Sequence, residues 1–241
     1  MNEKENTILF NLTSLIDLKP FIYIATVLFS IILIYWIYRK YQLSNYQLLI
    51  FILLVMFWAS INLIRAYRKV YATSPLEFGG IGLDGIIAAN IVAAYGLMSM
   101  FARLPVFMLS DYFTSRKKII GTALIFIFST SLSVYFKADA YTLFASSLAL
   151  GLGASILSLF NVMFAETFSA KQAIVSVSIL SIAPLLAEFL VAPVQSILTQ
   201  DTFKNYNILW LISSVLALLA FLFLIVVKDN KTKQRNFKVP R

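Results

Sequence analysis

The 241-residue chain contains no cysteine and no histidine. The absence of cysteine excludes disulfides, thiolate metal ligands and thiol nucleophiles. The absence of histidine removes the side chain that most often titrates near neutral pH, which is also the commonest metal ligand. Acidic residues are few as well, with 11 Asp and Glu against 20 Lys and Arg. Any proton chemistry therefore falls to a small number of carboxylates.

Charged residues make up only 13% of the chain, whereas hydrophobic residues make up 60%. A soluble protein of this length could not bury so much apolar surface. Apolar stretches of roughly 20 residues recur, and each is long enough to cross a hydrocarbon core of about 30 Å. Because lipid offers no hydrogen bonds to the backbone, such stretches are expected to be helices. The sequence predicts an all-α, polytopic membrane protein with about seven transmembrane helices, at residues 21–38, 46–68, 84–110, 118–136, 140–165, 172–198 and 207–227.

The net charge of +9 does not indicate a nucleic-acid partner. The bases lie at the ends of the apolar stretches and in the tail KDNKTKQRNFKVPR, where membrane topology explains them. The partner that the sequence predicts is the lipid bilayer of the plasma membrane. The distribution of Lys and Arg favours a cytoplasmic C-terminus, although the bases of RAYRK at 65–69 then fall on the opposite side. With an odd number of spans, the N-terminus is expected to be extracytoplasmic.

Enzyme classes find little support in the sequence. It contains no paired nucleophile and base, no cluster of metal ligands and no glycine loop of the kind that cradles phosphate. The glycines of GGIG at 79–82 lie outside an apolar stretch and indicate a loop or turn. We therefore expect a protein that is not an enzyme and that uses no cofactor and no metal.

One short loop between two spans carries a distinctive charge pattern. In ARLPVFMLSDYFTSRKKII, residues 102–120, an apolar run ends at Asp111, and three bases follow before the next apolar run. This stretch resembles the loop signature G-x-L-a-D-r-x-G-r-k-x-x-l of the major facilitator superfamily (MFS) of secondary transporters. Both glycines of the signature are replaced here, by Phe107 and Thr114. The resemblance implies a gating loop whose motif residues are Leu109, Asp111, Arg116 and Lys117.

The flanking segments resemble the same family. Residues 75–106 resemble the external loop and second helix of an MFS half, and residues 151–172 resemble its fourth helix and the loop after it. The replaced glycines and the basic tail favour the C-terminal half, and a first half with an added leading helix is the alternative. The implied organisation is an extracytoplasmic segment at 1–20, a leading helix and short loop at 21–45, a six-helix half at 46–228 and a basic cytoplasmic tail at 229–241.

The resemblance implies transport of a small solute by alternating access. Because the chain corresponds to one half of such a transporter, the second half is expected to come from another copy, in a homodimer, or from a separate first-half chain. The alternative is a membrane protein that does not transport, either a truncated remnant or a helical partner in a membrane assembly. The identity of the solute and of any coupling ion does not follow from the residues.

The intramembrane polar residues are unevenly distributed among the spans. In the family, helices one, two, four and five of a half line the central cavity, and helices three and six face lipid. The spans at 118–136 and 207–227, which correspond to helices three and six, hold nothing more polar than Ser, Thr and Tyr. The more polar residues all lie on the other spans of the half: Asn62, Arg65, Asn90, Arg103, Asn161, Glu188 and Gln195.

Two carboxylates are the leading candidates for a functional role. The acid that matches Asp111 in the family caps a helix of the opposite half, and the alternative is a solvated acid that pairs with Arg116. Glu188 lies near the middle of a span, where an ionised and unpaired carboxylate is costly. It is the best candidate for proton coupling or cation binding, and a role in helix packing is the alternative. Pro184 and Pro193 flank it and are expected to bend this helix.

For each of the remaining candidates, a structural role is the favoured alternative. Arg103 could bind an anionic group of the solute or pair within the protein, and Arg65 could attract anions or anchor the membrane interface. Glu166 resembles an acid that the family carries at the end of helix four, and we expect it to pair with a base. Four further residues could line a pocket or join helices by hydrogen bonds: Asn90, Tyr95, Asn161 and Gln195.

Overall fold

The computed structural model describes residues 19–113, 115–169, 172–199 and 206–227, and these residues form helices, turns and loops without a strand. The helices are α2 (Lys19–Lys40), α3 (Asn45–Arg65), α4 (Arg68–Thr73), the 3₁₀ helix η1 (Leu76–Phe78), α5 (Gly85–Phe101), α6 (Arg103–Phe113), α7 (Arg116–Phe136), α8 (Ala140–Ser155), α9 (Leu157–Ala165), α10 (Ala173–Leu198) and α11 (Asn207–Val226). The prediction of an all-α chain is confirmed for this described part.

The chain divides into two compact units after Leu43. In the first unit, α2 is an apolar helix whose Thr and Ser hydroxyl groups are satisfied locally. Thr26 Oγ1 donates to the carbonyl of Ile22 and Ser30 Oγ donates to that of Thr26, each at 2.8 Å. A hydroxyl that bonds its own helix adds no unpaired polar group to a membrane span. The second unit holds α3 to α11.

Six helical segments of the described residues are long and apolar enough to cross a membrane, and the bent pair α5–α6 makes seven if it counts as one span. The predicted number of about seven transmembrane helices is therefore confirmed. Besides the bent pair, two further spans are interrupted rather than continuous. One breaks between α3 and α4, and another breaks at Ile156 between α8 and α9.

The expected long helix at 84–110 is wrong in one respect, because it is bent by 48° between α5 and α6. Pro105 explains the position of the bend. Proline has no N–H, and its ring clashes with the carbonyl four residues earlier, which belongs to Phe101, the last residue of α5. At the other end of α5, Asp84 caps the helix by accepting the Ile86 N–H at 2.8 Å.

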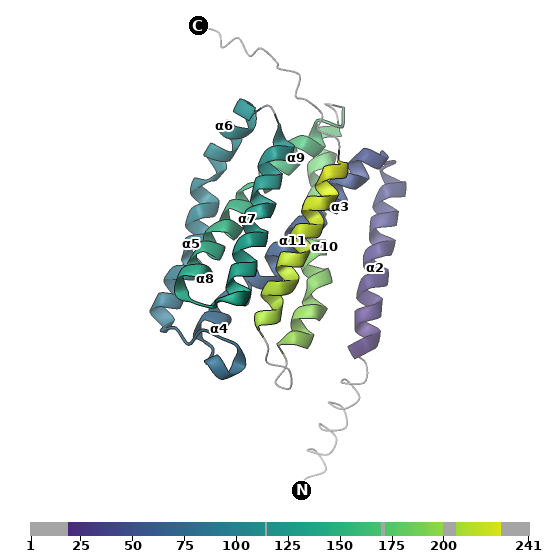
Figure 1. Ribbon diagram of the computed structural model, residues 1–241. Coiled ribbons are helices and arrows are strands. Elements are labelled where there is room, and N and C mark those ends of the chain that lie inside the picture. Colours follow the sequence, from purple (N-terminus) through teal and green to yellow (C-terminus); the bar gives the residue numbers. More distant parts are fainter. Residues whose placement is uncertain (1–18, 114, 170–171, 200–205, 228–241) are drawn as a thin grey trace, which may run out of the picture. The chain divides into compact units, whose positions relative to one another are not determined.

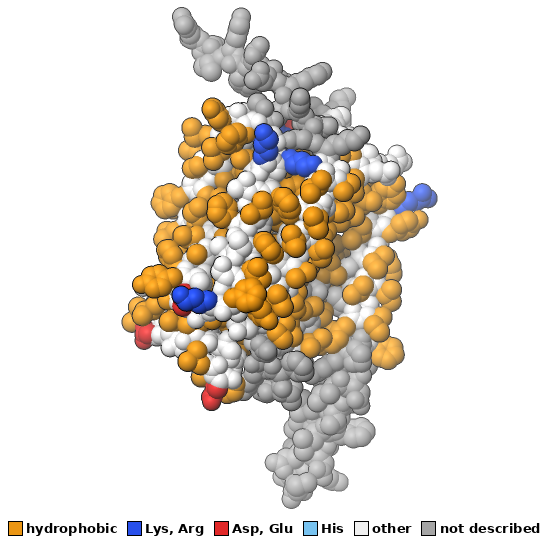
Figure 2. Space-filling view, viewed as in Figure 1, with side chains coloured by type: hydrophobic (Ala, Val, Ile, Leu, Met, Phe, Trp, Pro, Cys, Tyr) orange, Lys and Arg blue, Asp and Glu red, His pale blue; other side chains and the backbone are white. Residues whose placement is uncertain are grey.

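Helix α3 is the centre of the second unit (Figure 1). It packs against α8, α9, α10 and α11, and α7 packs against both α8 and α11. Phe57 of α3 and Phe160 of α9 are fully buried, with their ring centroids 5.4 Å apart. Figure 2 shows the face over α7 and α11, where hydrophobic side chains dominate and charged ones lie toward the two ends. This distribution suits contact with lipid.

Helices α5 and α8 lie close together at Gly151. A Cβ atom added to Gly151 would lie 2.5 Å from the carbonyl oxygen of Tyr95 and 2.8 Å from Cβ of Met98. Only a residue without a side chain fits there. A Cβ at Gly153, by contrast, would meet the side chains of Ile127 and Ile61. The close backbone approach therefore involves Gly151.

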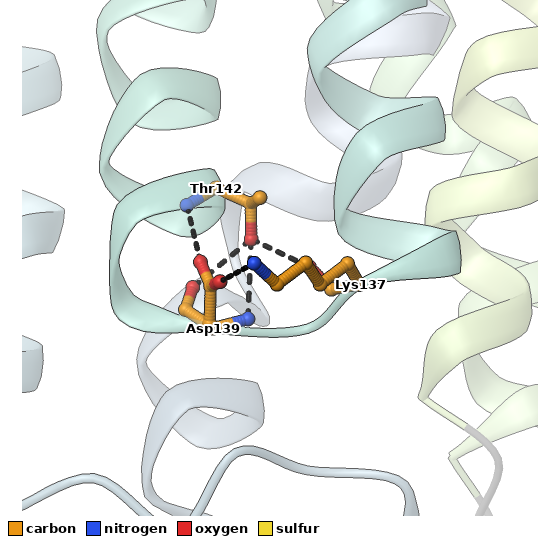
Figure 3. A network of polar contacts seen from close by, with 3 residues as sticks. All are labelled: Lys137, Asp139 and Thr142. Carbon is orange, nitrogen blue, oxygen red and sulfur yellow. Dashed lines mark hydrogen bonds and ion pairs between the residues drawn. The ribbon is translucent and has the colours of Figure 1, made fainter.

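The loop between α7 and α8 is held by a reciprocal capping box (Figure 3). Asp139 Oδ1 accepts the Thr142 N–H at 2.8 Å, and Thr142 Oγ1 accepts the Asp139 N–H at 3.1 Å. Lys137 Nζ lies 3.3 Å from Asp139 Oδ2. The first of these bonds, from the Thr142 backbone, is the main cause that lowers the pKa of Asp139 below its ordinary value of 3.8.

Candidate functional site

The loop motif spans the end of α6 and the start of α7. Leu109 and Asp111 lie exposed on α6, and Asp111 makes no hydrogen bond or ion pair within the described chain. Ser115 begins α7 as its N-cap, with its Oγ accepting the Lys118 N–H at 3.3 Å. The motif position occupied by Thr114 lies outside the described residues.

Arg116 binds Glu166, which follows the last residue of α9. Its two terminal nitrogens reach the two carboxylate oxygens, with Nη2 and Oε1 2.6 Å apart. The predicted pairing of Glu166 with a base is therefore confirmed. A bidentate pair of this kind fixes orientation as well as distance, so the start of α7 is tied to the end of α9.

Lys117 has a structural partner of a different kind. Its Nζ donates to the carbonyls of Ile225 and Val227, each at 2.8 Å. These carbonyls belong to the C-terminal end of α11, which leaves several backbone acceptors without helical partners. A lysine in this position satisfies two of them and places a positive charge at the negative end of the helix dipole. Two neighbouring bases of the loop thus hold α7 to α9 and to α11.

A second set of polar contacts joins α3 to α10. Because α3 ends at Arg65, the N–H of Tyr67 turns to the carbonyl of Ile64, and the carbonyls of Asn62 and Leu63 need other donors. Gln195 Nε2 of α10 supplies both bonds, each at 2.9 Å. Gln195 thus caps the C-terminal end of α3 from a distant part of the sequence.

The Asn62 side chain makes a third contact with α10. Its Nδ2 donates to the carbonyl of Pro184 at 3.3 Å, while its buried Oδ1 has no hydrogen-bond partner. Pro184 and Pro193 both lie inside α10, which runs without a break from Ala173 to Leu198. Glu188, four residues after Pro184, is exposed.

The other predicted site residues are spread over α3, α5, α6 and α9. Asn90 on α5 and Arg103 at the start of α6 are exposed. The remaining three, Arg65, Tyr95 and Asn161, are partly exposed on α3, α5 and α9. No hydrogen bond joins these five side chains to one another. They do not form a closed constellation within the described chain.

The sequence did not single out Arg68, which is buried, with an exposed fraction of only 3%. Its Nε donates to the carbonyl of Arg65 at 3.2 Å, its Nη1 donates to Ser147 Oγ at 3.3 Å, and its guanidinium lies 4.5 Å from the centre of the Tyr95 ring. The sequence RAYRK at 65–69 indicates the end of a span, but it does not reveal that Arg68 begins a further short helix, α4. Arg68 thereby joins α4 to α5 and α8.

Neither the comparison with protein families nor that with curated proteins finds a match to the sequence. The fold, however, matches solved structures. It is similar to a peptide transporter POT in complex with sulfate, with a TM-score of 0.65 and 18% identity over 76% of this chain and 37% of that chain. A mutant of POT in complex with alafosfalin matches with a TM-score of 0.63 and 18% identity, over 74% of this chain and 37% of the other.

The chain has a transporter fold. It spans 37% of the length of these peptide transporters. The MFS-like half that the loop motif predicted is confirmed at the level of fold, and the chain is a multi-pass membrane protein. At 18% identity the likeness shows the fold alone.

Proposed function

We propose that this chain is one half of a two-half membrane transporter, which moves a small solute by alternating access. The fold supports membrane transport in general, and the 37% share of the matched transporters supports a half rather than a whole. In this proposal the solute site lies between two halves near the middle of the membrane. The six-helix half comprises residues 46–228, and the leading helix and short loop of 21–45 precede it in the sequence.

The observation that carries the proposal is a pair of unmatched groups on one side of the bundle. Asp111 is exposed and without a partner in the described chain. Helix α10 begins with no side-chain cap on its first turn and no acidic residue there. A helix N-terminus attracts a carboxylate because it bears a partial positive charge.

The two groups belong to the same side of the membrane. Helix α7 starts at Arg116, beside Asp111, and crosses to Phe136; α8 and α9 cross back, and the Arg116–Glu166 contact closes this return. Helix α10 begins shortly after Glu166, hence on the same side. A second half placed against this face would bring an acid such as Asp111 to the start of a helix such as α10.

The second half is either another copy of this chain, in parallel orientation, or a separate first-half chain. Native mass spectrometry of the protein purified in mild detergent tests this directly. We expect a dimer or a stoichiometric second membrane protein. A clean monomer under conditions that retain bound lipid contradicts the two-half assembly and favours a membrane protein that does not transport.

The exposed polar residues on α5, α6 and α10 are the proposed lining of the solute path, with Asn90, Arg103 and Glu188 as its exposed members. The partly exposed Arg65, Tyr95 and Asn161 extend this lining, and Gln195 supports it. Solute uptake into vesicles tests the assignment, with Glu188→Gln expected to lower the rate at least about tenfold if its charge changes are used in each cycle. Glu77→Gln, at an exposed acid of η1, is the control and is expected to leave uptake unchanged.

We propose a plasma-membrane location with the C-terminus in the cytoplasm and the N-terminus outside, on the grounds of the Lys and Arg distribution. The basic tail itself lies outside the described residues. In this orientation Asp111 and Arg116 face the cytoplasm. Labelling of single introduced cysteines with a membrane-impermeant reagent tests the orientation, because the chain has no cysteine of its own.

A further inference from the structure

We propose that Glu188 and Asn62 form a proton-binding site where α10 packs on α3, in which the protonated carboxyl group of Glu188 donates a hydrogen bond to Asn62 Oδ1. The inference concerns this chain alone, and only its use as a coupling step rests on the proposed transport function. It names the proton as the ion, Glu188 as the group that binds it, and Asn62 Oδ1 as the acceptor of the resulting hydrogen bond.

The first observation is the unpartnered oxygen of Asn62. The residue is 5% exposed, and its Oδ1 is a buried acceptor without a donor. The amide cannot be turned over to remove the problem. Its Nδ2 donates to the carbonyl of Pro184, and a flipped amide would place two acceptors against each other there. A buried acceptor in this state calls for a donor that is absent from the contacts of the described chain.

The second observation is the position of Glu188. In an α-helix the carbonyl of one residue lies beside the N–H of the residue four positions later, so the Pro184 carbonyl lies beside the backbone of Glu188. Asn62 Nδ2 is 3.3 Å from that carbonyl. Side chains on a helix lean toward its N-terminus, which directs the side chain of Glu188 back toward the level of Pro184 and Asn62.

The register of α10 agrees with this placement. Pro184, Glu188, Val191 and Gln195 follow one another at spacings of four, three and four residues, which puts them along one stripe of the helix. Pro184 and Gln195, at the two ends of the stripe, both bond α3. Glu188 lies between them, yet it is exposed and makes no hydrogen bond or ion pair in the described chain.

The chemistry of the two groups selects a proton. An ionised carboxylate offers only acceptors, as Asn62 Oδ1 does, so the two cannot bond each other. Transfer of a proton from hydronium to the carboxylate forms one O–H bond and releases water, and it turns Glu188 into a donor. A metal ion would need further oxygen ligands, and the described residues hold no group of three acidic, His or Cys side chains.

The charged and titratable groups around α10 do not supply an alternative partner. Helix α3 carries Tyr46 near its start and Arg65 as its last residue, and neither forms an ion pair with Glu188. Helices α9 and α11 contain no charged residue; Glu166 follows the first and Tyr206 precedes the second.

Trp58, one turn before Asn62 on α3, has a buried Nε1 donor that is also unpartnered. It is the competing donor for Asn62.

Protonation in this scheme moves Glu188 from the exposed face toward the contact of α3 and α10. The same contact is held by the Asn62 and Gln195 bonds. A change in the protonation of Glu188 therefore alters how strongly α10 packs against α3. In a transporter, that would link loading of the proton to the movement of α10.

Infrared spectroscopy of the purified full-length protein tests the site without any solute. As the pH is lowered, we expect a carbonyl stretch of a protonated carboxylic acid that is absent in Glu188→Gln. In Asn62→Leu the band should shift to the higher frequency of a carboxylic acid without a hydrogen bond. Glu77→Gln, Arg65→Gln and Trp58→Phe should leave its position unchanged. Lack of a Glu188 band, or a band that Asn62→Leu does not shift, overturns the proposal.

Thermal unfolding supplies a second, independent readout. Gln at position 188 donates to Asn62 at every pH, so Glu188→Gln should raise Tm by about 2–4 °C at high pH, and this difference should vanish as the pH falls. The difference should also vanish in the Asn62→Leu background, or in Asn62→Ala if the first variant does not fold. A pH-independent difference refutes the proposal. If both readouts behave as expected while vesicles show no uptake, the proton site stands and the transport function fails.

Discussion

Arg116 and Glu166 lie fifty residues apart in the sequence and bind each other through both nitrogens and both oxygens of their terminal groups. The pair joins Arg116, a basic residue of the loop motif, to the end of α9. The arginine is largely buried, with 11% of its side chain exposed, whereas 44% of the glutamate side chain is exposed. The contact therefore combines a fixed guanidinium with a carboxylate that solvent still reaches.

Removal of either partner should destabilise the bundle moderately. Because the glutamate is partly solvated, we expect Arg116→Gln to cost about 1 kcal/mol of unfolding free energy. The double variant Arg116→Gln/Glu166→Gln should cost little more than the single variant. Arg116→Lys should recover only part of the loss, since lysine cannot make the bidentate contact. Unfolding in detergent measures these differences.

Lys118→Gln is the matched control, because Lys118 is an exposed base two residues further along α7. It should leave the unfolding free energy within about 0.5 kcal/mol of the original value. Equal losses for Lys118→Gln and Arg116→Gln would show that the general charge of the loop matters rather than the ion pair.

Gly151 and Gly96 make a second matched comparison. A Cβ at Gly151 meets the backbone of α5, whereas a Cβ at Gly96 meets nothing within 4 Å. We expect Gly151→Ala to destabilise the bundle by about 1–3 kcal/mol, because the helices must separate. Gly96→Ala should be neutral or stabilising, since alanine favours a helix over glycine. Similar melting temperatures for the two variants would contradict the close approach.

The positions of the spans could be predicted from the sequence because their cause is local. A run of about 20 apolar residues has few alternatives to a membrane helix. The breaks inside the spans are less visible, since apolar residues continue through them. The bend at Ala102 had a local signal in Pro105, while the break at Ile156 lies in an apolar run without proline.

The contacts that join distant segments could be predicted only in part. The pairing of Glu166 with a base followed from the resemblance, but its partner depends on where α7 and α9 meet. The bonds of Gln195 to the end of α3 span more than 130 residues, and no sequence pattern specifies them. Arg68 was missed for the same reason, because its partners Ser147 and Tyr95 belong to other helices.

Acid should loosen the start of α8. The Thr142 N–H bonds the ionised form of Asp139, so the pKa of Asp139 is lowered. A lowered pKa means that the cap stabilises the folded state above the ordinary value of 3.8 and that this stabilisation is lost as the pH falls through the lowered value. At the amides of residues 140–143, protection against hydrogen exchange, measured relative to the intrinsic rate at the same pH, should fall in acid.

Variants of Asp139 separate the cap from general acid effects. Asp139→Ala should accelerate exchange at these amides at neutral pH and remove most of the further acid-dependent change. Asp139→Asn should retain much of the protection, because asparagine is also a good N-cap residue. Protection that is the same in Asp139→Ala and the original chain would exclude the capping role.

The bend between α5 and α6 should depend on Pro105. Alanine at this position restores the N–H and removes the clash with the Phe101 carbonyl, so Pro105→Ala should straighten the pair. At a rise of 1.5 Å per residue, removal of the 48° bend lengthens the distance between positions 86 and 112 by about 3 Å. Spin labels on Ile86→Cys and Tyr112→Cys can report this distance, since both side chains are exposed and the chain has no other cysteine.

Leu104→Ala, at the exposed neighbouring position, should leave the distance unchanged. An unchanged distance in Pro105→Ala would mean that packing of α6 against α7 and α8, rather than the proline, sets the bend.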